Sequence, residues 1–296
     1  MTIREPDTLQ RFIFEHVPVR GTVVHLDNTW RTILERRHYP PPIRDLLGQL
    51  MAAASLLATT IKFDGRLTIQ AKGHGPVRLL VVECTSQQTL RAIAQWQGEI
   101  PDSPLAGGST ALLGDSQLAI TIEPDEGVRY QSVIEVDAPT LSEVLEHYFA
   151  RSEQLATRLW LATDPSRAAG MLLQRLPEQS LHNVDDWDRI SHLGSTLSRE
   201  ELLDLPVPAL LHRLYHEDDI RLFEGQAVSF HCSCTRSRVK SALRLLGLDE
   251  VRSILAERGQ VDVDCEFCGL HYEFDRVDAE QLFATSTVTL ASPIRH

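Results

Sequence analysis

The chain has few cysteines, few aromatic side chains and too little positive charge to balance its acidic residues. Among 296 residues there are five cysteines, and aromatic residues make up 6%. The sequence has 29 basic and 41 acidic side chains, which gives a formal net charge of −12. Binding to nucleic acid draws on counterion release at a basic surface. This charge balance therefore argues against nucleic acid as a partner.

Long apolar runs are also missing. The most apolar stretch, residues 46–61, is shorter than the roughly 18 residues that a membrane span needs, and it contains Gln49. The first residues, MTIREPDTLQRF, lack the cationic start and apolar run of a secretory signal. We therefore expect a cytoplasmic globular protein with no membrane partner, in which 46–61 is part of a buried helix.

Residues 1–177 alternate strand-like runs with turn signals and helical patterns. The strand-like runs are 21–27, 65–73, 76–85, 116–124 and 128–137. Helical spacing of apolar residues predicts helices over 43–61 and 139–162. This mixture predicts an α+β core domain. Cys84 lies in an apolar strand run, and we expect it to be buried and inert because a free cysteine behaves as a small hydrophobe.

Residues 178–231 form an acidic segment that predicts a helical linker. The segment holds 11 acidic and 4 basic side chains. Ser198 and Glu201 have the spacing of a capping box. Pro206 and Pro208 are expected to divide the following Leu-rich run into two short helices. Because short helices depend on packing, we expect a weakly held, metastable linker.

Residues 232–296 predict a small third domain. Two short helices end at Gly247 and Gly259, and residues 261–274 have the pattern of a hairpin with a Cys-x-x-Cys motif at its turn. The predicted fold class is therefore α+β, with an N-terminal core domain, a helical linker and a small C-terminal zinc-binding domain.

Four of the five cysteines occur as two close pairs, in FHCSCTRSR and DCEFCGLHY. They are Cys232, Cys234, Cys265 and Cys268. In a reducing compartment such pairs favour a metal or redox site over structural disulfides. Four thiolates complete the tetrahedral shell of zinc, so we expect one zinc per chain, with His231 and His271 outside the ligand set.

A closed zinc shell leaves no position for a substrate, so we expect no catalytic residue and no enzyme. The Cys-x-Cys motif holds its Cα atoms near the upper limit for a disulfide, which would make that disulfide strained and easily reduced. The motif suits a reversible oxidation switch and also fits a permanent zinc clip. Two further alternatives are a zinc-ribbon adaptor or nucleic-acid module, and a thiol oxidoreductase acting through Cys265 and Cys268.

Long motifs in all three segments carry a resemblance to a known family. They are GHGPVRLLVVE at 73–83, YFARSEQLATRLWLA at 148–162, LLQRLP at 172–177, LSREELLDLPVPALLHRLYHEDDI at 197–220 and the pattern HCSC…DCEFCGLHYEF. With these motifs the chain resembles the redox-regulated heat-shock chaperones known as the 33 kDa chaperonin family. His231 departs from the pattern, because Lys or Arg is expected there.

The resemblance implies an ATP-independent holdase that is inactive when reduced and zinc-bound. It further implies that oxidation forms the disulfides Cys232–Cys234 and Cys265–Cys268, expels zinc and unfolds the C-terminal domain and the linker. The oxidised form would bind unfolding client proteins and act as a homodimer. Loop-closure entropy favours these short rings in an unfolded chain, whereas ring strain in Cys-x-Cys opposes the first of them.

Overall fold

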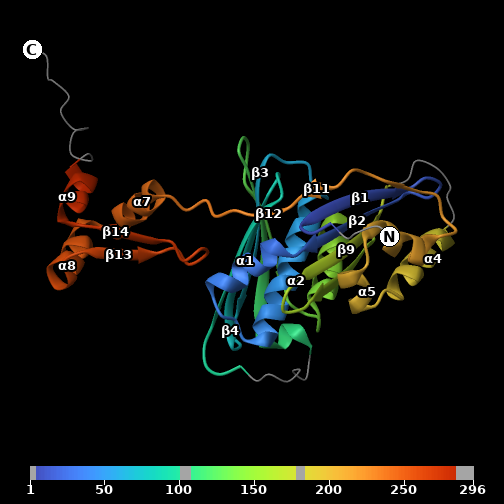
Figure 1. Ribbon diagram of the computed structural model, residues 1–296, viewed down its shortest axis with the longest axis horizontal. Helices are drawn as coiled ribbons and strands as arrows, with labels where there is room; N and C mark the ends of the chain where they lie inside the picture. Colours follow the sequence, from blue (N-terminus) through green and yellow to red (C-terminus); the bar gives the residue numbers. More distant parts are fainter. Residues whose placement is uncertain (1–4, 101–107, 178–183, 285–296) are drawn as a thin grey trace, which may run out of the picture. The chain divides into compact units, whose positions relative to one another are not determined.

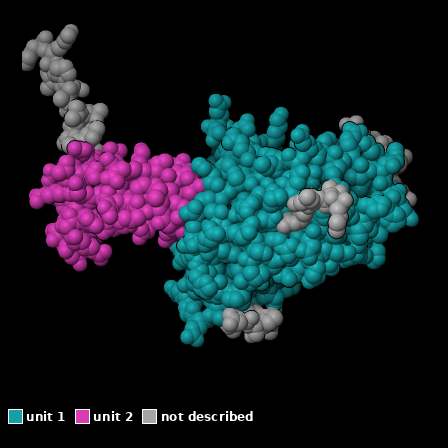
Figure 2. Space-filling view, viewed as in Figure 1, with its two compact units in different colours: residues 1–231 teal, residues 232–296 magenta. Residues whose placement is uncertain are grey.

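The computed structural model of the protein describes residues 5–100, 108–177 and 184–284, and it confirms the α+β fold class. The chain divides into two compact units, residues 1–231 and 232–296 (Figure 2). Within the described ranges, no helix is both long and apolar enough to cross a bilayer.

The first unit contains two sheets, and the first of these is antiparallel throughout. Its strand order is β10-β1-β2-β9-β8, and β11 pairs with β1 (Figure 1). The strands are β1 (Thr8–Phe14), β2 (Val19–Leu26), β8 (Thr157–Thr163), β9 (Ala168–Arg175), β10 (Ile220–Leu222) and β11 (Gln226–Ala227). The central β2–β9 pair places Val23 opposite Met171, so this sheet joins distant parts of the sequence.

The second sheet has the order β12-β5-β4-β3-β6-β7. Its strands are β3 (Gly65–Gly73), β4 (Val77–Thr85), β5 (Thr89–Trp96), β6 (Ser116–Pro124), β7 (Tyr130–Glu135) and β12 (Ser229–Phe230). The neighbours in this sheet pair antiparallel, except that β12 runs parallel to β5.

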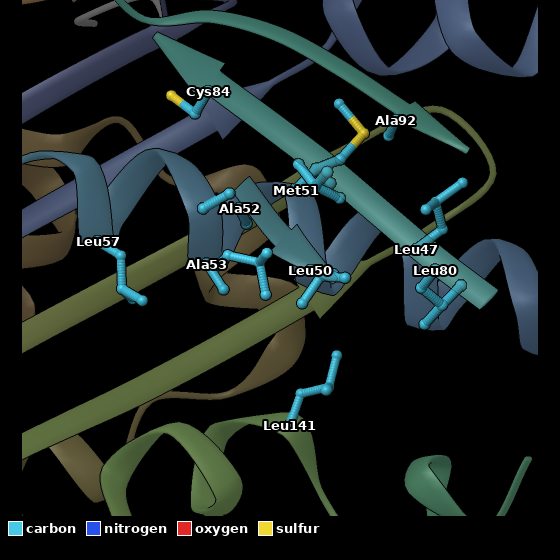
Figure 3. Close-up of a cluster of buried hydrophobic side chains, with 14 of the residues drawn as sticks. Leu47, Leu50, Met51, Ala52, Ala53, Leu57, Leu80, Cys84, Ala92 and Leu141 are labelled. Carbon is cyan, nitrogen blue, oxygen red and sulfur yellow. The ribbon is translucent and has the colours of Figure 1, made fainter. Parts of the chain in front are cut away.

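Helix α2 (Pro41–Ala58) forms the centre of the main core, because it packs against strands of both sheets. Leu50 and Met51 on this helix are fully buried and lie near Leu80 of β4 (Figure 3). Cys84 belongs to the same cluster and is buried, as expected. Burial raises the pKa of its thiol, so it remains protonated and unreactive. The predicted helix over 43–61 is confirmed, although it ends three residues earlier.

The predicted helix over 139–162 is wrong in its second half. Helix α3 (Leu141–Tyr148) begins with a capping box and continues as a single π-helical turn, Phe149–Glu153. Gln154 then adopts a left-handed backbone with φ of 55°, and the chain enters β8. Pairing of β8 along the full length of β9 overrides the helical spacing of its apolar residues. The sequence prediction also left out β1, β5 and β9.

Three short helices of the acidic segment cover the first sheet on the face opposite α2. They are α4 (Val184–Ser195), α5 (Arg199–Asp204) and α6 (Val207–Tyr215). The capping box of Ser198 and Glu201 and the break at Pro206 are confirmed. The leucines of α5 and α6 are buried in one cluster with Phe12 and Met171; these leucines are Leu202, Leu203, Leu210, Leu211 and Leu214.

The described part of the second unit consists of α7 (Arg236–Leu246), α8 (Leu248–Arg258), the hairpin β13 (Val261–Asp264) with β14 (His271–Phe274), and α9 (Arg276–Ala284). The two helices that end at Gly247 and Gly259 and the hairpin confirm the sequence prediction. The buried apolar cluster of this unit is small and centres on Val251 and Phe274.

Candidate metal centre

The hairpin turn of the second unit presents Cys265 and Cys268. Asp264 pairs with His271 at the last register position before the turn. Within the turn, the Gly269 N–H donates to the Cys265 carbonyl at 2.7 Å, and the Cys265 N–H donates to the Leu270 carbonyl at 3.0 Å. Gly269 has φ of 67°, which favours glycine at this position. These bonds fix the backbone on which both thiols stand.

The Cys-x-Cys motif lies in the extended segment that leads into α7. Thr235 caps this helix by accepting a hydrogen bond from the Arg238 N–H at 3.2 Å. The Arg238 guanidinium reaches back to the Ser233 carbonyl at 2.8 Å. The first turn of α7 therefore holds the backbone between Cys232 and Cys234.

The four Sγ atoms lie within 4.8 Å of one another, and each cysteine is partly buried. The Cys232 and Cys265 sulfurs are 3.7 Å apart, and the Cys234 and Cys268 sulfurs are 3.3 Å apart. Zinc–sulfur bonds of about 2.3 Å in a tetrahedron place sulfurs about 3.8 Å apart. The four cysteines can therefore hold a metal ion.

Hydrogen bonding makes the Cys234 thiol more acidic than an ordinary cysteine thiol. Burial opposes its ionisation, but hydrogen bonds from the Tyr272 hydroxyl and the neighbouring thiols outweigh burial and lower its pKa to about 7. The Tyr272 hydroxyl lies 3.2 Å from the Cys234 sulfur. Burial raises the pKa of Cys265 and of Cys268. A thiolate therefore forms at Cys234 at a lower pH than at Cys265 or Cys268.

Tyr272 contacts the cysteine cluster, although the sequence pattern placed it only within the predicted hairpin, 261–274. Its position on β14 could have indicated the contact, because Tyr272 and Phe274 lie two residues apart on the buried face of the hairpin and Tyr272 follows Cys268 by four residues.

His271 is engaged outside the cysteine cluster. Its Nδ1 atom lies 2.6 Å from an Asp264 carboxylate oxygen, and its Nε2 atom lies 3.4 Å from Asp262 and 3.3 Å from Glu273. The hydrogen bond to Asp264 raises the pKa of His271. His231, in the first unit, donates its backbone N–H to the Leu90 carbonyl.

Two of the cations on α7 are paired within the unit. Arg236 lies 2.7 Å and Lys240 lies 3.5 Å from the carboxylate of Asp278 on α9. Arg236 also stacks on the Phe274 ring at 4.4 Å. These contacts give the basic residues of α7 a role in packing.

Known proteins resemble this chain in sequence and in fold. The sequence model of a family described as "Hsp33 protein" matches residues 7–275. A protein named "33 kDa chaperonin" from Methylobacillus flagellatus is 45% identical over 293 residues, covering 98% of this chain and 99% of that protein. One of the same name from Aeromonas salmonicida is 46% identical over 282 residues, covering 94% and 95%.

A crystal structure from Thermotoga maritima, titled as a 33 kDa chaperonin and heat shock protein 33 homolog, has the same fold. It superimposes with a TM-score of 0.81 at 22% identity, covering 95% of this chain and 99% of that one. By its sequence, from residue 7 to residue 275, the chain belongs to the Hsp33 protein family.

Proposed function

We propose that the chain is a redox-regulated, ATP-independent chaperone that binds unfolding proteins only after oxidation. The chaperone role is supported by the family and by the name "33 kDa chaperonin" of its relatives. The single observation that carries the redox control is the cluster of four thiols within 4.8 Å in a unit with a small apolar core.

In the reduced state one zinc ion is held by Cys232, Cys234, Cys265 and Cys268. The spacing of their sulfurs supports this assignment, as does the hydrogen bond from Tyr272 that stabilises the Cys234 thiolate. Structural zinc contributes an apparent ~10–16 kcal/mol in small peptides. A whole domain is stable by only ~5–15 kcal/mol. Loss of zinc therefore unfolds the second unit.

Oxidation forms Cys232–Cys234 and Cys265–Cys268. Each disulfide forms when two thiols lose two protons and two electrons to an oxidant such as peroxide, which is reduced to water. In the folded site the short sulfur distances of 3.7 and 3.3 Å instead join residues of different pairs. Adjacent pairing therefore follows unfolding, when loop-closure entropy favours the short rings over the long ones by about 2 kcal/mol.

The proposed division of the chain is 1–177 as core domain, 178–231 as metastable linker and 232–296 as redox-switch domain. Opening of the linker uncovers the apolar face of the first sheet, because Leu210 and Leu214 pack against that face. A reducing cytoplasm fits a protein whose resting state needs four free thiols. A homodimer in the oxidised state is proposed from the family resemblance, and no enzymatic step is required.

Aggregation of a chemically denatured test protein, followed by light scattering without nucleotide, tests the proposal. We expect suppression by the peroxide-oxidised chain and none by the reduced, zinc-loaded chain. A Cys84→Ala variant, which keeps the four clustered thiols and removes only the buried fifth one, serves as the matched control and is expected to respond to peroxide as the parent chain does. Equal scattering with reduced and oxidised protein would refute the redox control.

A further inference from the structure

Residues 226–231, which we call the bridging segment, pass from the first sheet to the second just before Cys232. Gln226 and Ala227 form β11 against β1, and Ser229 and Phe230 form β12 against β5 (Figure 1). Each of these strands is two residues long. The segment therefore depends on the surface that receives it, and not on a sheet of its own.

Three backbone carbonyls of the first unit receive the bridging segment. The Val228 N–H donates to the Asp7 carbonyl at 2.7 Å, the Ser229 N–H to the Gln88 carbonyl at 3.1 Å and the His231 N–H to the Leu90 carbonyl at 3.0 Å. Because these bonds use only backbone donors of the segment, another extended chain can supply the same donors.

Alternate side chains of the segment point into the first unit. Val228 is 3% exposed and belongs to the main core cluster. Phe230 packs against that cluster and lies under the Arg36 guanidinium, 4.7 Å from the centre of its ring. Ala227 and Ser229 are exposed. The receiving surface therefore takes an apolar side chain and, two residues later, an aromatic one.

The receiving surface is fixed by bonds that do not involve the bridging segment. Asp7, with φ of 49°, accepts the N–H groups of Asp27, Asn28 and Thr29 at the start of α1 (Asn28–Arg36) through its carboxylate. Gln88, with φ of 59° and 2% exposure, accepts a 2.6 Å hydrogen bond from the Ser55 hydroxyl. The carbonyls of Asp7 and Gln88 therefore stay in place when the segment leaves.

We infer that this surface, occupied in the reduced state by residues 226–231, binds an extended segment of an unfolding client in the oxidised state. The client segment has an apolar residue followed two positions later by an aromatic one, a pattern that strands bury in folded proteins. The inference rests on the proposed function and assigns a client site to it. Edge strands accept added chains through main-chain hydrogen bonds, which makes such a site tolerant of sequence.

The covalent position of the bridging segment explains how oxidation frees the surface. One end continues from β10, which pairs with β1, and the other end enters Cys232 of the sulfur cluster. A segment held at its β10 end competes at a high effective concentration with any client. The segment is the last part of the proposed linker, so when the linker opens and β10 leaves β1, this effective concentration falls and a client segment can displace residues 226–231.

Binding of a labelled peptide to the full-length chain tests the site. The peptide EGQAVSFH repeats residues 224–231, and its affinity is measured by fluorescence anisotropy. We expect at least tenfold tighter binding to the oxidised chain than to the reduced, zinc-loaded chain. The control is the same peptide N-methylated at the amides equivalent to Ser229 and His231, which cannot donate to Gln88 and Leu90. Equal affinity for both peptides overturns the inference.

Cross-linking locates the client itself. A photoreactive benzoylphenylalanine replaces Thr89, the residue of β5 that pairs with Ser229. Its cross-linking is compared with that of benzoylphenylalanine in place of Val128, which is 89% exposed. We expect oxidised protein to cross-link a denatured client at least fivefold more at position 89, and excess peptide to abolish the difference. Aggregation suppression with equal cross-linking at both positions overturns the site but leaves the proposed function standing. Absence of suppression refutes both.

Discussion

Replacing Leu210 by alanine is expected to open the acidic segment without oxidant. Leu210 lies on α6, is fully buried and packs in the cluster that joins α5 and α6 to the first sheet. A buried Leu→Ala change costs about 2–5 kcal/mol, depending on how far the site collapses. Because α5 and α6 are short and depend on packing, the loss is expected mainly as local opening. If the substitution costs about 3 kcal/mol, the equilibrium constant for local opening of the segment increases by about two orders of magnitude.

Hydrogen exchange of the reduced, zinc-loaded chain measures this opening. Amides of α6 are expected to exchange about 100-fold faster in Leu210→Ala, while amides of β3 in the second sheet keep their protection. Leu245→Ala removes the same atoms from a side chain that is 91% exposed and serves as the control. Aggregation suppression by reduced Leu210→Ala is expected to rise with the exchange rate.

Two results would contradict this reasoning. Unchanged exchange in α6 would mean that Leu210 does not limit opening of the segment. Equal acceleration in α6 and in the second sheet would mean that the segment unfolds only together with the whole first unit, and the proposed linker would then have no separate metastability.

Three further predictions concern the sulfur cluster. Cys265→Ser is expected to remove most of the zinc that elemental analysis finds in the reduced chain, and undiminished zinc would exclude Cys265 as a ligand. Tryptic digestion of oxidised protein, which cuts at Arg236, is expected to give separate peptides containing Cys232–Cys234 and Cys265–Cys268; a cross-linked peptide would show that the folded site selects the partners. Because zinc needs all four thiolates and burial raises the pKa of Cys265 and Cys268, zinc release to a chromogenic chelator is expected to increase as the pH falls. Tyr272→Phe removes a hydrogen bond that lowers the pKa of Cys234 and is expected to move release to higher pH; an unchanged profile would exclude the contact as a source of the shift.

The features that the sequence predicted correctly are specified by residues close together in the chain. The hairpin around Cys265 and Cys268 needs only alternating strands and a turn, and α7 and α8 end at glycines with positive φ. The capping box of Ser198 and the break at Pro206 act within one turn of helix. Such features form from local interactions and do not depend on the packing of distant parts of the chain.

The features that the sequence did not predict depend on distant partners. The spacing of Leu159 and Leu161 fits a helix as well as a strand. Residues 157–163 form a strand because they pair with β9. The strands β11 and β12 are two residues long, which is too short for a strand pattern in the sequence. They are strands because they pair with β1 and β5. The contact between Tyr272 and Cys234 joins residues 38 positions apart.

The burial of Cys84 gives the chain a separate chemical reporter for each unit. This thiol lies on β4 of the second sheet and is part of the main core (Figure 3), and burial raises its pKa, whereas the other four cysteines are partly exposed. An alkylating reagent applied to the reduced, zinc-loaded chain is therefore expected to consume four thiols when the second unit releases zinc and unfolds, while the first unit stays folded. Consumption of the fifth thiol marks the temperature or denaturant concentration at which the first unit itself gives way, so one titration resolves two unfolding events in a single chain.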